Sequence, residues 1–190
     1  MNEILSIFEQ TGAVLDGHFL LSSGLHSPRY VQCALVLQYP DQAAHLGALL
    51  AEYFRQAQPQ VVLAPAIGGI IVAHEVARAL GARAMFAERK HSDMQLRRGF
   101  HLAPGERVVV VEDVVTTGES LNEVIQIALN RGGQVVGVGS LINRGRGLLF
   151  PLGLKLHSLV TLEIPTYQPG ECPLCQQGMP FTAPGTRQSA

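Results

Sequence analysis

The feature that most constrains this chain is the stretch over residues 108–120. It opens with a run of four valines, 108–111, which is typical of a short strand buried on both faces of a parallel sheet. Glu112 and Asp113 follow directly, and a Thr-Thr-Gly-Glu-Ser turn comes next. Apolar residues then recur at helical spacing beyond Ser120. The stretch therefore predicts a buried strand, an acidic pair, a loop and a helix, in that order.

This order of elements predicts a phosphate-binding loop. The N–H groups of the loop and of the first helical turn point to one spot and favour an anion there. Glu112 and Asp113 would repel a phosphate, so we expect them to face sugar hydroxyls, a developing cation or hydrated Mg²⁺. An ordinary strand-to-helix turn would need neither adjacent carboxylates nor two threonines, and the chain has no Gly-x-x-x-x-Gly-Lys-Ser/Thr sequence of a P-loop. The expected ligand carries a phosphate with a polyol beside it.

Composition favours one compact domain. The 190 residues are 47% hydrophobic and 15% charged, which is typical of a globular protein with a sizeable core. A net charge of −1 argues against a nucleic-acid or membrane surface. No apolar run approaches the roughly 20 residues that span a bilayer, and the N-terminus lacks a signal-peptide pattern. We therefore expect a cytoplasmic protein that binds neither nucleic acid nor membranes.

Apolar runs alternate with helical patterns along the chain. We expect helices up to residue 12 and over 40–57, 70–80 and 120–131, and strands over 61–64, 82–88, 108–111, 135–142 and 154–164. Other segments are expected as two short extended pieces around a turn (19–31), an exposed basic loop (89–98), a hairpin turn (103–106) and a tail docked as loops or loosely ordered (from 165). This alternation indicates an α/β fold with a mainly parallel, twisted sheet. The loops after residues 63, 88, 111 and 142 should converge on one site, because ligands bind beyond the carboxyl ends of parallel strands.

The stretch over residues 108–120 resembles the phosphoribosyl-pyrophosphate motif of the type I phosphoribosyltransferases. Residues 17–28 are similar to the Phe-x-Leu-x-Ser-Gly-x-Lys-Ser-Pro segment of the orotate phosphoribosyltransferases, with His26 where that family often has lysine. The resemblance spans nearly the whole chain, including a Cys-Pro-Leu-Cys tail like that of the shorter bacterial members. It implies a single domain over 1–190. Its core, over about 41–164, would hold about five strands, and a small hood would come from about 1–36 and the C-terminal segment.

The resemblance also implies an activity. Orotate phosphoribosyltransferases transfer the 5-phosphoribosyl group from phosphoribosyl pyrophosphate to orotate, giving orotidine 5′-monophosphate and pyrophosphate in pyrimidine (UMP) biosynthesis. Their Mg²⁺ is held mainly by substrate and water, so no direct protein ligand is expected. The family forms homodimers, and loop 89–98 of one subunit would reach the neighbouring site. Two alternatives stay open: a purine-salvage phosphoribosyltransferase, and a regulatory protein that senses phosphoribosyl pyrophosphate.

The motif assigns roles to individual residues. Glu112 and Asp113 are expected to bind the ribose hydroxyls and to stabilise positive charge on the ribose ring. The 5′-phosphate and its surroundings are assigned to Val114, Val115, Thr116, Thr117, Gly118, Glu119 and Ser120. Gly68 and Gly69 would let the backbone approach the pyrophosphate closely. Cations for the leaving pyrophosphate are expected from Arg89, Lys90 and His91, although the residue that replaces the family's catalytic lysine stays open.

The resemblance places Thr116, Arg144 and His26 at the orotate. The guanidinium of Arg144 suits the orotate carboxylate because it can form two parallel hydrogen bonds. The alternative is a solvated loop arginine, and Arg146 lies nearby in the sequence. Many family members have a lysine where Gly68 stands, so the pyrophosphate contact should be weaker unless His26 or the basic loop supplies the charge.

Cys172 and Cys175 have the spacing of metal ligands. A single pair is only half a zinc site, and no pattern supports Cys33 or His157 as the missing ligands. A thioredoxin-like role is disfavoured because the pair does not lie between a strand and a helix. We therefore expect packed thiols in a turn of the tail, with zinc binding as the less favoured alternative.

Overall fold

The computed structural model describes residues 3–21 and 23–184. The strands are β1 (Val14–Leu20), β2 (His26–Val31), β3 (Val61–Pro65), β4 (Arg83–Lys90), β5 (Asp93–Leu96), β6 (Arg107–Val115), β7 (Gln134–Asn143) and β8 (Leu156–Thr161). The α-helices are α1 (Glu3–Gln10), α2 (Ala34–Leu37), α3 (Pro40–Glu52), α4 (Gly69–Leu80), α5 (Glu119–Asn130) and α6 (Pro173–Gln176). Short 3₁₀ turns cover Arg55–Ala57, Pro151–Gly153 and Pro169–Glu171.

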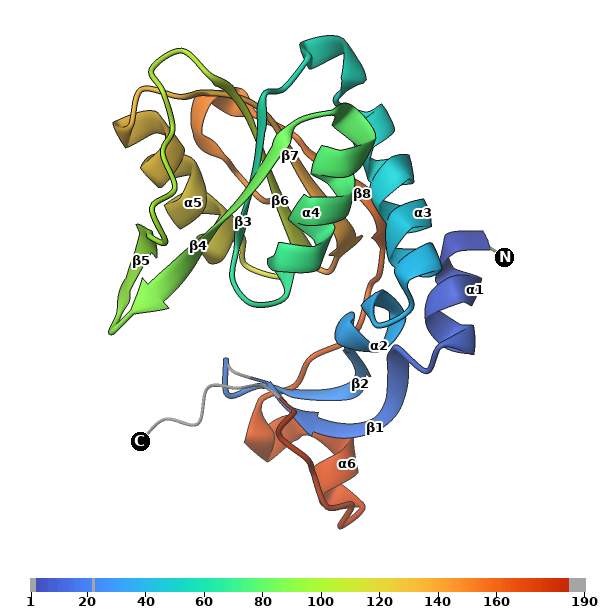
Figure 1. Ribbon diagram of the computed structural model, residues 1–190. Coiled ribbons are helices and arrows are strands. Elements are labelled where there is room, and N and C mark those ends of the chain that lie inside the picture. The colour runs from blue at the N-terminus through green and yellow to red at the C-terminus, as the bar shows by residue number, and fades with distance from the viewer. Residues whose placement is uncertain (1–2, 22, 185–190) are drawn as a thin grey trace.

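The main sheet has six strands in the order β5-β4-β3-β6-β7-β8. Neighbours from β4 to β8 are parallel, and β5 is antiparallel to β4. Helices α3 and α4 cover one face and α5 covers the other (Figure 1). The α/β fold with a mainly parallel sheet is thereby confirmed. Because β3 and β6 are neighbours and their following helices lie on opposite faces, the carboxyl end of the sheet near β6 is where a ligand site is expected.

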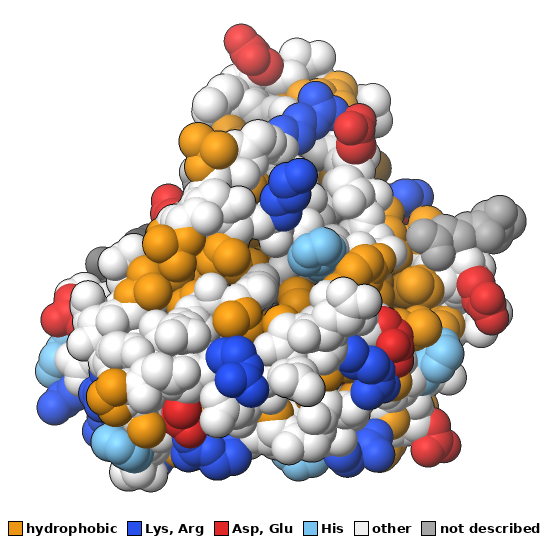
Figure 2. Space-filling model, turned by 90° about the horizontal axis from the view of Figure 1, so that it is seen from above, with side chains coloured by type: hydrophobic (Ala, Val, Ile, Leu, Met, Phe, Trp, Pro, Cys, Tyr) orange, Lys and Arg blue, Asp and Glu red, His pale blue; other side chains and the backbone are white. Residues whose placement is uncertain are grey.

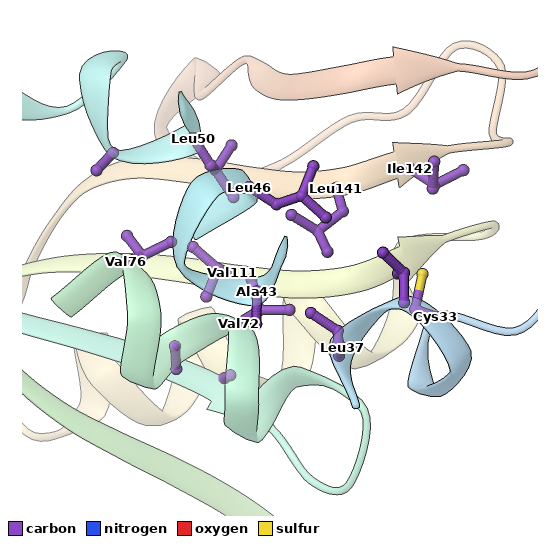
Figure 3. Close-up of a cluster of buried hydrophobic side chains, with 14 of the residues drawn as sticks. Cys33, Leu37, Ala43, Leu46, Leu50, Val72, Val76, Val111, Leu141 and Ile142 are labelled. Carbon is purple, nitrogen blue, oxygen red and sulfur yellow. The ribbon is translucent and has the colours of Figure 1, made fainter. Parts of the chain in front are cut away.

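The valine run of β6 supplies both halves of the core. Val109 and Val111 belong to the cluster under α3 and α4, whereas Val108 and Val110 belong to the cluster under α5. All four are fully buried, as expected for a strand covered on both faces. Figure 3 shows the first cluster, in which side chains of α3 and α4 meet those of β6 and β7. Each such valine contributes on the order of 1.5–3 kcal/mol through burial.

The segment over 89–98 is a hairpin, which corrects the expected exposed loop. β4 continues to Lys90 and pairs with β5, with Ala87 opposite Leu96 and Lys90 opposite Asp93. The hairpin lies at the edge of the main sheet, so most of its side chains are exposed and the sequence shows no alternation of apolar and polar residues (Figure 1). Only Leu96 is buried, against the cluster under α5.

The hairpin expected around residues 103–106 is also wrong. A turn does form there, with Glu106 N–H donating to the Ala103 carbonyl at 3.2 Å. Residues 99–102, however, are not a strand, and β6 pairs in parallel with β3 and β7. The turn therefore leads into a central strand of the sheet and not back along a neighbouring one.

The β1–β2 hairpin stands apart from the main sheet and is covered by the tail, residues 165–184 (Figure 1). The His26 N–H donates to the Tyr167 carbonyl at 2.8 Å, and the Tyr167 N–H donates back at 2.9 Å. Further along, the Leu20 N–H donates to the Thr182 carbonyl and the Thr182 N–H to the His18 carbonyl, both at 2.9 Å. The tail is thus docked on the hairpin at both ends, with α6 between them.

The surface shows charges of both signs side by side. Figure 2 views the end of the molecule away from the β1–β2 hairpin, where basic and acidic side chains are scattered among hydrophobic ones. Within the part of the chain that the structure describes, no helix is long and apolar enough to cross a membrane.

Candidate active site

A cavity of about 1170 Å³ lies between the carboxyl end of the main sheet and the β1–β2 hairpin. The loop after β6, the residues after β7 and the residues after β8 form the sheet side of its wall. Of the residues expected at the phosphoribosyl group, the wall contains Asp113, Val114, Thr116, Thr117, Glu119 and Ser120. Arg144, expected at the base, lines the same cavity. The structure therefore brings the two halves of the predicted site together.

The loop between β6 and α5 is built to receive an anion. Gly118 precedes the helix with φ of 79° and has no side chain to cap the first turn, where the Glu119 N–H makes only a long hydrogen bond of 3.4 Å to Thr117 Oγ1. The left-handed conformation favours glycine, and a Cβ here would also lie 3.3 Å from the ring of Phe150. Thr116 and Thr117 are exposed to the cavity at the same point. The start of the helix and the threonine hydroxyls thus face an open space, as a phosphate site requires.

The acidic pair lies inside β6, which runs four residues beyond the valine run and ends at Val115. Burial, and then the charge of Asp113, raise the pKa of Glu112 from 4.5 to about 8. Burial also raises the pKa of Asp113, although backbone N–H groups partly oppose the shift. Among the described ion pairs none involves either carboxylate. The pair is thus poised to gain a cation or hydroxyl donors.

Gly68 and Gly69, in the loop after β3, lie beside the acidic pair and not in the cavity wall. A Cβ on Gly68 would lie 2.5 Å from both carboxylate oxygens of Asp113. A Cβ on Gly69 would lie 2.8 Å from the Cβ of Ala64. Both positions therefore need glycine in this backbone, and the close approach of the loop after β3 to Asp113 of β6 depends on Gly68.

Arg144 and Arg146 differ sharply in their surroundings. Arg144 is half-buried, burial lowers the pKa of its guanidinium, and its buried Nε has no hydrogen-bond partner among the described residues. Arg146 is exposed and pairs with Glu163 at 2.8 Å. An unpaired buried donor is costly, on the order of 1–3 kcal/mol, unless a ligand satisfies it. Arg144 is therefore the arginine that is prepared for a ligand.

Tyr30 is a cavity residue that the sequence did not reveal. It is half-buried in the wall, and burial followed by the charge of Asp113 raises its pKa. The charge of Arg144 acts on the same hydroxyl in the opposite direction, so Tyr30 sits near both. In the sequence, the only indication of this role was that Tyr30 lies two residues after the segment over 17–28 that resembles the family motif.

The basic residues of the β4–β5 hairpin are outside this cavity. Arg89 pairs with Glu123 of α5 at 2.7 Å and donates to the Ser92 carbonyl at 2.7 Å. Lys90 and His91 are exposed at the tip of the hairpin, and no described interaction involves their side chains. Within one chain, these residues do not reach the cavity wall.

His26 also lies elsewhere than expected. Its side chain is 3% exposed and is absent from the cavity wall. The ring is held against His18 under the tail, with His18 Nε2 and His26 Nδ1 2.7 Å apart. The structure therefore does not bring His26 to the base site, because the tail covers the side of β2 from which its ring projects.

Comparisons with known proteins agree with this geometry. Residues 35–159 match the family model for the phosphoribosyl transferase domain. Orotate phosphoribosyltransferase from Desulforamulus reducens is 52% identical over 186 residues, covering 98% of this chain and 97% of the relative.

Solved structures give the same result. The orotate phosphoribosyltransferase of Aeropyrum pernix has a TM-score of 0.73 at 28% identity, covering 84% of this chain and 94% of the other. The Mycobacterium tuberculosis enzyme in complex with inorganic phosphate has a TM-score of 0.68 at 27% identity, covering 85% and 95%. The sequence matches, the shared fold and the cavity lead to one conclusion: this chain belongs to the orotate phosphoribosyltransferase family of phosphoribosyltransferases.

Proposed function

We propose that the protein transfers the 5-phosphoribosyl group from phosphoribosyl pyrophosphate to orotate, releasing pyrophosphate. The observation that carries this proposal is the unpaired Nε of Arg144 in the wall of a cavity that also contains the loop over 116–120. A carboxylate-bearing base satisfies that guanidinium, while the phosphate of the sugar occupies the loop. One cavity of about 1170 Å³ accommodates both ligands.

The phosphate end of the substrate binds at the start of α5. The N–H groups after Gly118 donate to the phosphate oxygens, and the positive end of the helix dipole adds to the attraction. Thr116, Thr117 and Ser120 supply hydroxyl donors from the same wall. These contacts fix the ribose so that its reacting carbon faces the base.

The acidic pair acts on the ribose. Asp113 lines the cavity, and Glu112 precedes it in the same strand. Ribose hydroxyls donate to carboxylate oxygens, and the negative charge stabilises the cationic ribose as the bond to pyrophosphate breaks. Because the pKa of Glu112 in the free protein is about 8, ligand binding shifts this group towards its charged form.

The proposal includes Mg²⁺ as cofactor. Carboxylate oxygens are donors that Mg²⁺ prefers, and Glu112 and Asp113 form no described ion pair, so the residues fit the ion. Bound Mg²⁺ supplies charge neutralisation to the departing pyrophosphate. We place its contacts mainly on substrate and water, next to this pair.

The proposal also includes a cytoplasmic homodimer in which the β4–β5 hairpin of one subunit serves the neighbouring site. Its support is the exposed, unpaired tip: Lys90 and His91 project from the sheet edge and find no acidic partner within the described chain. Cations on a mobile tip can cover a pyrophosphate and exclude water as the bond breaks. Arg89 would have to leave Glu123 to take part.

A direct assay tests the choice of base. Orotate consumption is followed by absorbance with phosphoribosyl pyrophosphate and Mg²⁺, beside parallel reactions with hypoxanthine and adenine. We expect turnover of orotate alone, because a purine has no carboxylate for Arg144. Turnover of a purine without orotate turnover would establish the purine-salvage alternative. Binding of phosphoribosyl pyrophosphate without turnover of any base would support the sensor alternative.

A pair of variants tests the role of the guanidinium. Arg144→Ala should raise KM for orotate about 10- to 100-fold, since a charge-assisted hydrogen bond contributes roughly 1.5–3 kcal/mol. KM for phosphoribosyl pyrophosphate should stay within about twofold, because the phosphate loop is untouched. Arg146→Ala is the matched control: Arg146 lines the same cavity but already pairs with the exposed Glu163, so both constants should change much less than in Arg144→Ala. Equal effects of the two substitutions on orotate would remove Arg144 from the base site.

A further inference from the structure

Four side chains that the reaction does not use meet between the β1–β2 hairpin and the tail. They are His18 of β1, His26 at the start of β2, and Cys172 and Cys175 of the tail. One nitrogen or sulfur atom from each lies within 4.8 Å of the others. The histidines and the cysteines are separated by about 150 residues of sequence, so only the folded tail brings them together (Figure 1).

We propose that these four residues form a structural zinc site. In a tetrahedral site with Zn–S near 2.3 Å and Zn–N near 2.0–2.1 Å, neighbouring ligand atoms lie about 3.3 Å (N–N), 3.6 Å (N–S) and 3.8 Å (S–S) apart. The observed distances from His18 Nε2 are 2.7 Å to His26 Nδ1, 3.5 Å to Cys172 Sγ and 3.8 Å to Cys175 Sγ. Cys175 Sγ lies 3.3 Å from His26 Nδ1. These four distances differ from the tetrahedral values by about 0.6 Å or less, and all the ligand atoms lie within 4.8 Å of one another, so small adjustments suffice to accept the ion.

The protonation of His18 favours a cation at the centre. His18 Nδ1 lies 2.8 Å from the Met179 carbonyl, which can only accept, so Nδ1 carries the proton. In the neutral ring Nε2 is then a bare lone pair, and it faces three potential ligand atoms at once. A single hydrogen bond to His18 Nε2 would leave the other two ligand atoms without a partner, whereas a metal ion can bind all four ligand atoms. A carbonyl on the far nitrogen is also the usual way in which a ligating histidine is oriented.

Burial and charge identify the class of site. His18 is 4% exposed, His26 3% and Cys172 0%, so the cluster is closed to solvent on most sides. Four protein ligands leave no open position for a substrate, which is typical of a structural and not a catalytic site. Two thiolates and two neutral imidazoles around Zn²⁺ have no net charge, which suits a buried position. Mixed sulfur and nitrogen ligands in a tetrahedral arrangement favour zinc over Mg²⁺ or Ca²⁺.

The site would hold the cavity wall in place. A two-stranded hairpin alone is marginally stable, and β1–β2 is not part of the main sheet. Leu20 and Leu25, at the ends of the turn that joins His18 to His26, line the substrate cavity. The zinc ion would fix the tail to this hairpin midway between the backbone bonds at Tyr167 and Thr182. It would therefore stabilise the wall without contacting substrate.

Metal analysis of the whole protein tests the site. The untagged protein, expressed with zinc and passed through a desalting column, is analysed by inductively coupled plasma mass spectrometry. We expect about one zinc per chain. Replacement of zinc by Co²⁺ should give the visible bands of a tetrahedral ion and a near-ultraviolet thiolate-to-cobalt band. Less than about one-tenth of an ion per chain, with either metal, would overturn the proposal.

Variants identify the ligands. Cys175→Ser and His18→Ala should each lower the bound metal at least tenfold, whereas Cys33→Ala, at the cysteine outside the cluster, should retain it. If a variant does not fold, the wild-type protein is treated with a chelator instead. A strong chelator should then release the zinc together with loss of the cobalt spectrum, and should lower the melting temperature. Metal loss in Cys33→Ala, or a Cys172–Cys175 disulfide in metal-free native protein, would refute the assignment.

Discussion

Glu112→Gln should stabilise the protein without ligands at high pH and not at low pH. Burial first, and then Asp113, raise the pKa of Glu112 from 4.5 to about 8. The folded protein therefore retains a proton that the unfolded chain releases between these values. Stability from this group is fully present below about pH 4.5 and is lost as the pH rises through about 8. Glutamine cannot ionise, so it avoids the loss.

The magnitude follows from the same values. One pKa unit corresponds to about 1.4 kcal/mol, so a change from 4.5 to about 8 sets a ceiling of about 5 kcal/mol. We expect about 2 kcal/mol, because the side chain keeps some contact with water, which stabilises the charged form. Near pH 5 the gain should fall below about 1 kcal/mol, because the folded wild-type protein is neutral at this position and the pH is only slightly above the value of 4.5 at which the unfolded chain ionises.

Chemical unfolding in urea at about pH 5 and about pH 9 measures both values. Glu9→Gln serves as the control, because Glu9 is exposed on α1 and its replacement should change the free energy of unfolding little at either pH. The same stability gain for Glu112→Gln at both pH values would refute the reasoning. So would an equally pH-dependent gain in the control.

Two further predictions concern the site. Lys90→Ala and Arg144→Ala chains are each expected to have lowered activity at low orotate concentration. They should regain activity when mixed as dimers if the β4–β5 hairpin acts across the subunit interface, since one of the two sites then has both residues intact. Mass spectrometry verifies that mixed dimers have formed. If they have formed and activity does not recover, the hairpin acts on the site of its own subunit or on no site. Gly68→Ala should lower kcat/KM at least tenfold, because its Cβ would lie 2.5 Å from the carboxylate oxygens of Asp113 and displace them. Gly170→Ala, which has open space, should leave kcat/KM and the melting temperature unchanged.

The core and the phosphate loop were predictable because local sequence determines them. The valine run of β6 alternates between the two core clusters, and the helix after Gly118 begins where the pattern predicts. The fold and the family followed from these elements together with the resemblance. Sequence also selected Arg144 over Arg146, although only the structure shows that Glu163 satisfies the second arginine and leaves the first without an ion-pair partner in the described chain.

Other features depend on contacts between distant segments. The part of the hairpin beyond residue 88 is mostly polar because β5 is the edge strand of the sheet, so it has no apolar period to detect. Cys172 and Cys175 were interpreted as packed thiols because their histidine neighbours lie about 150 residues earlier. His26 was assigned to the base by its place in a motif, and only the docked tail shows that its ring faces the cysteines.

The docking of the tail on the β1–β2 hairpin has a consequence for the order of folding during synthesis. The strands of the main sheet all leave the ribosome before Tyr167 and Thr182, the residues that bond to the hairpin. The β1–β2 hairpin is synthesised first, but the tail residues that bond to it are synthesised last. The strands of the sheet and the loop after β6 are therefore complete in the chain before the tail can close over the hairpin, and we expect a chain that ends at residue 165 to form the main sheet but to leave the β1–β2 hairpin uncovered.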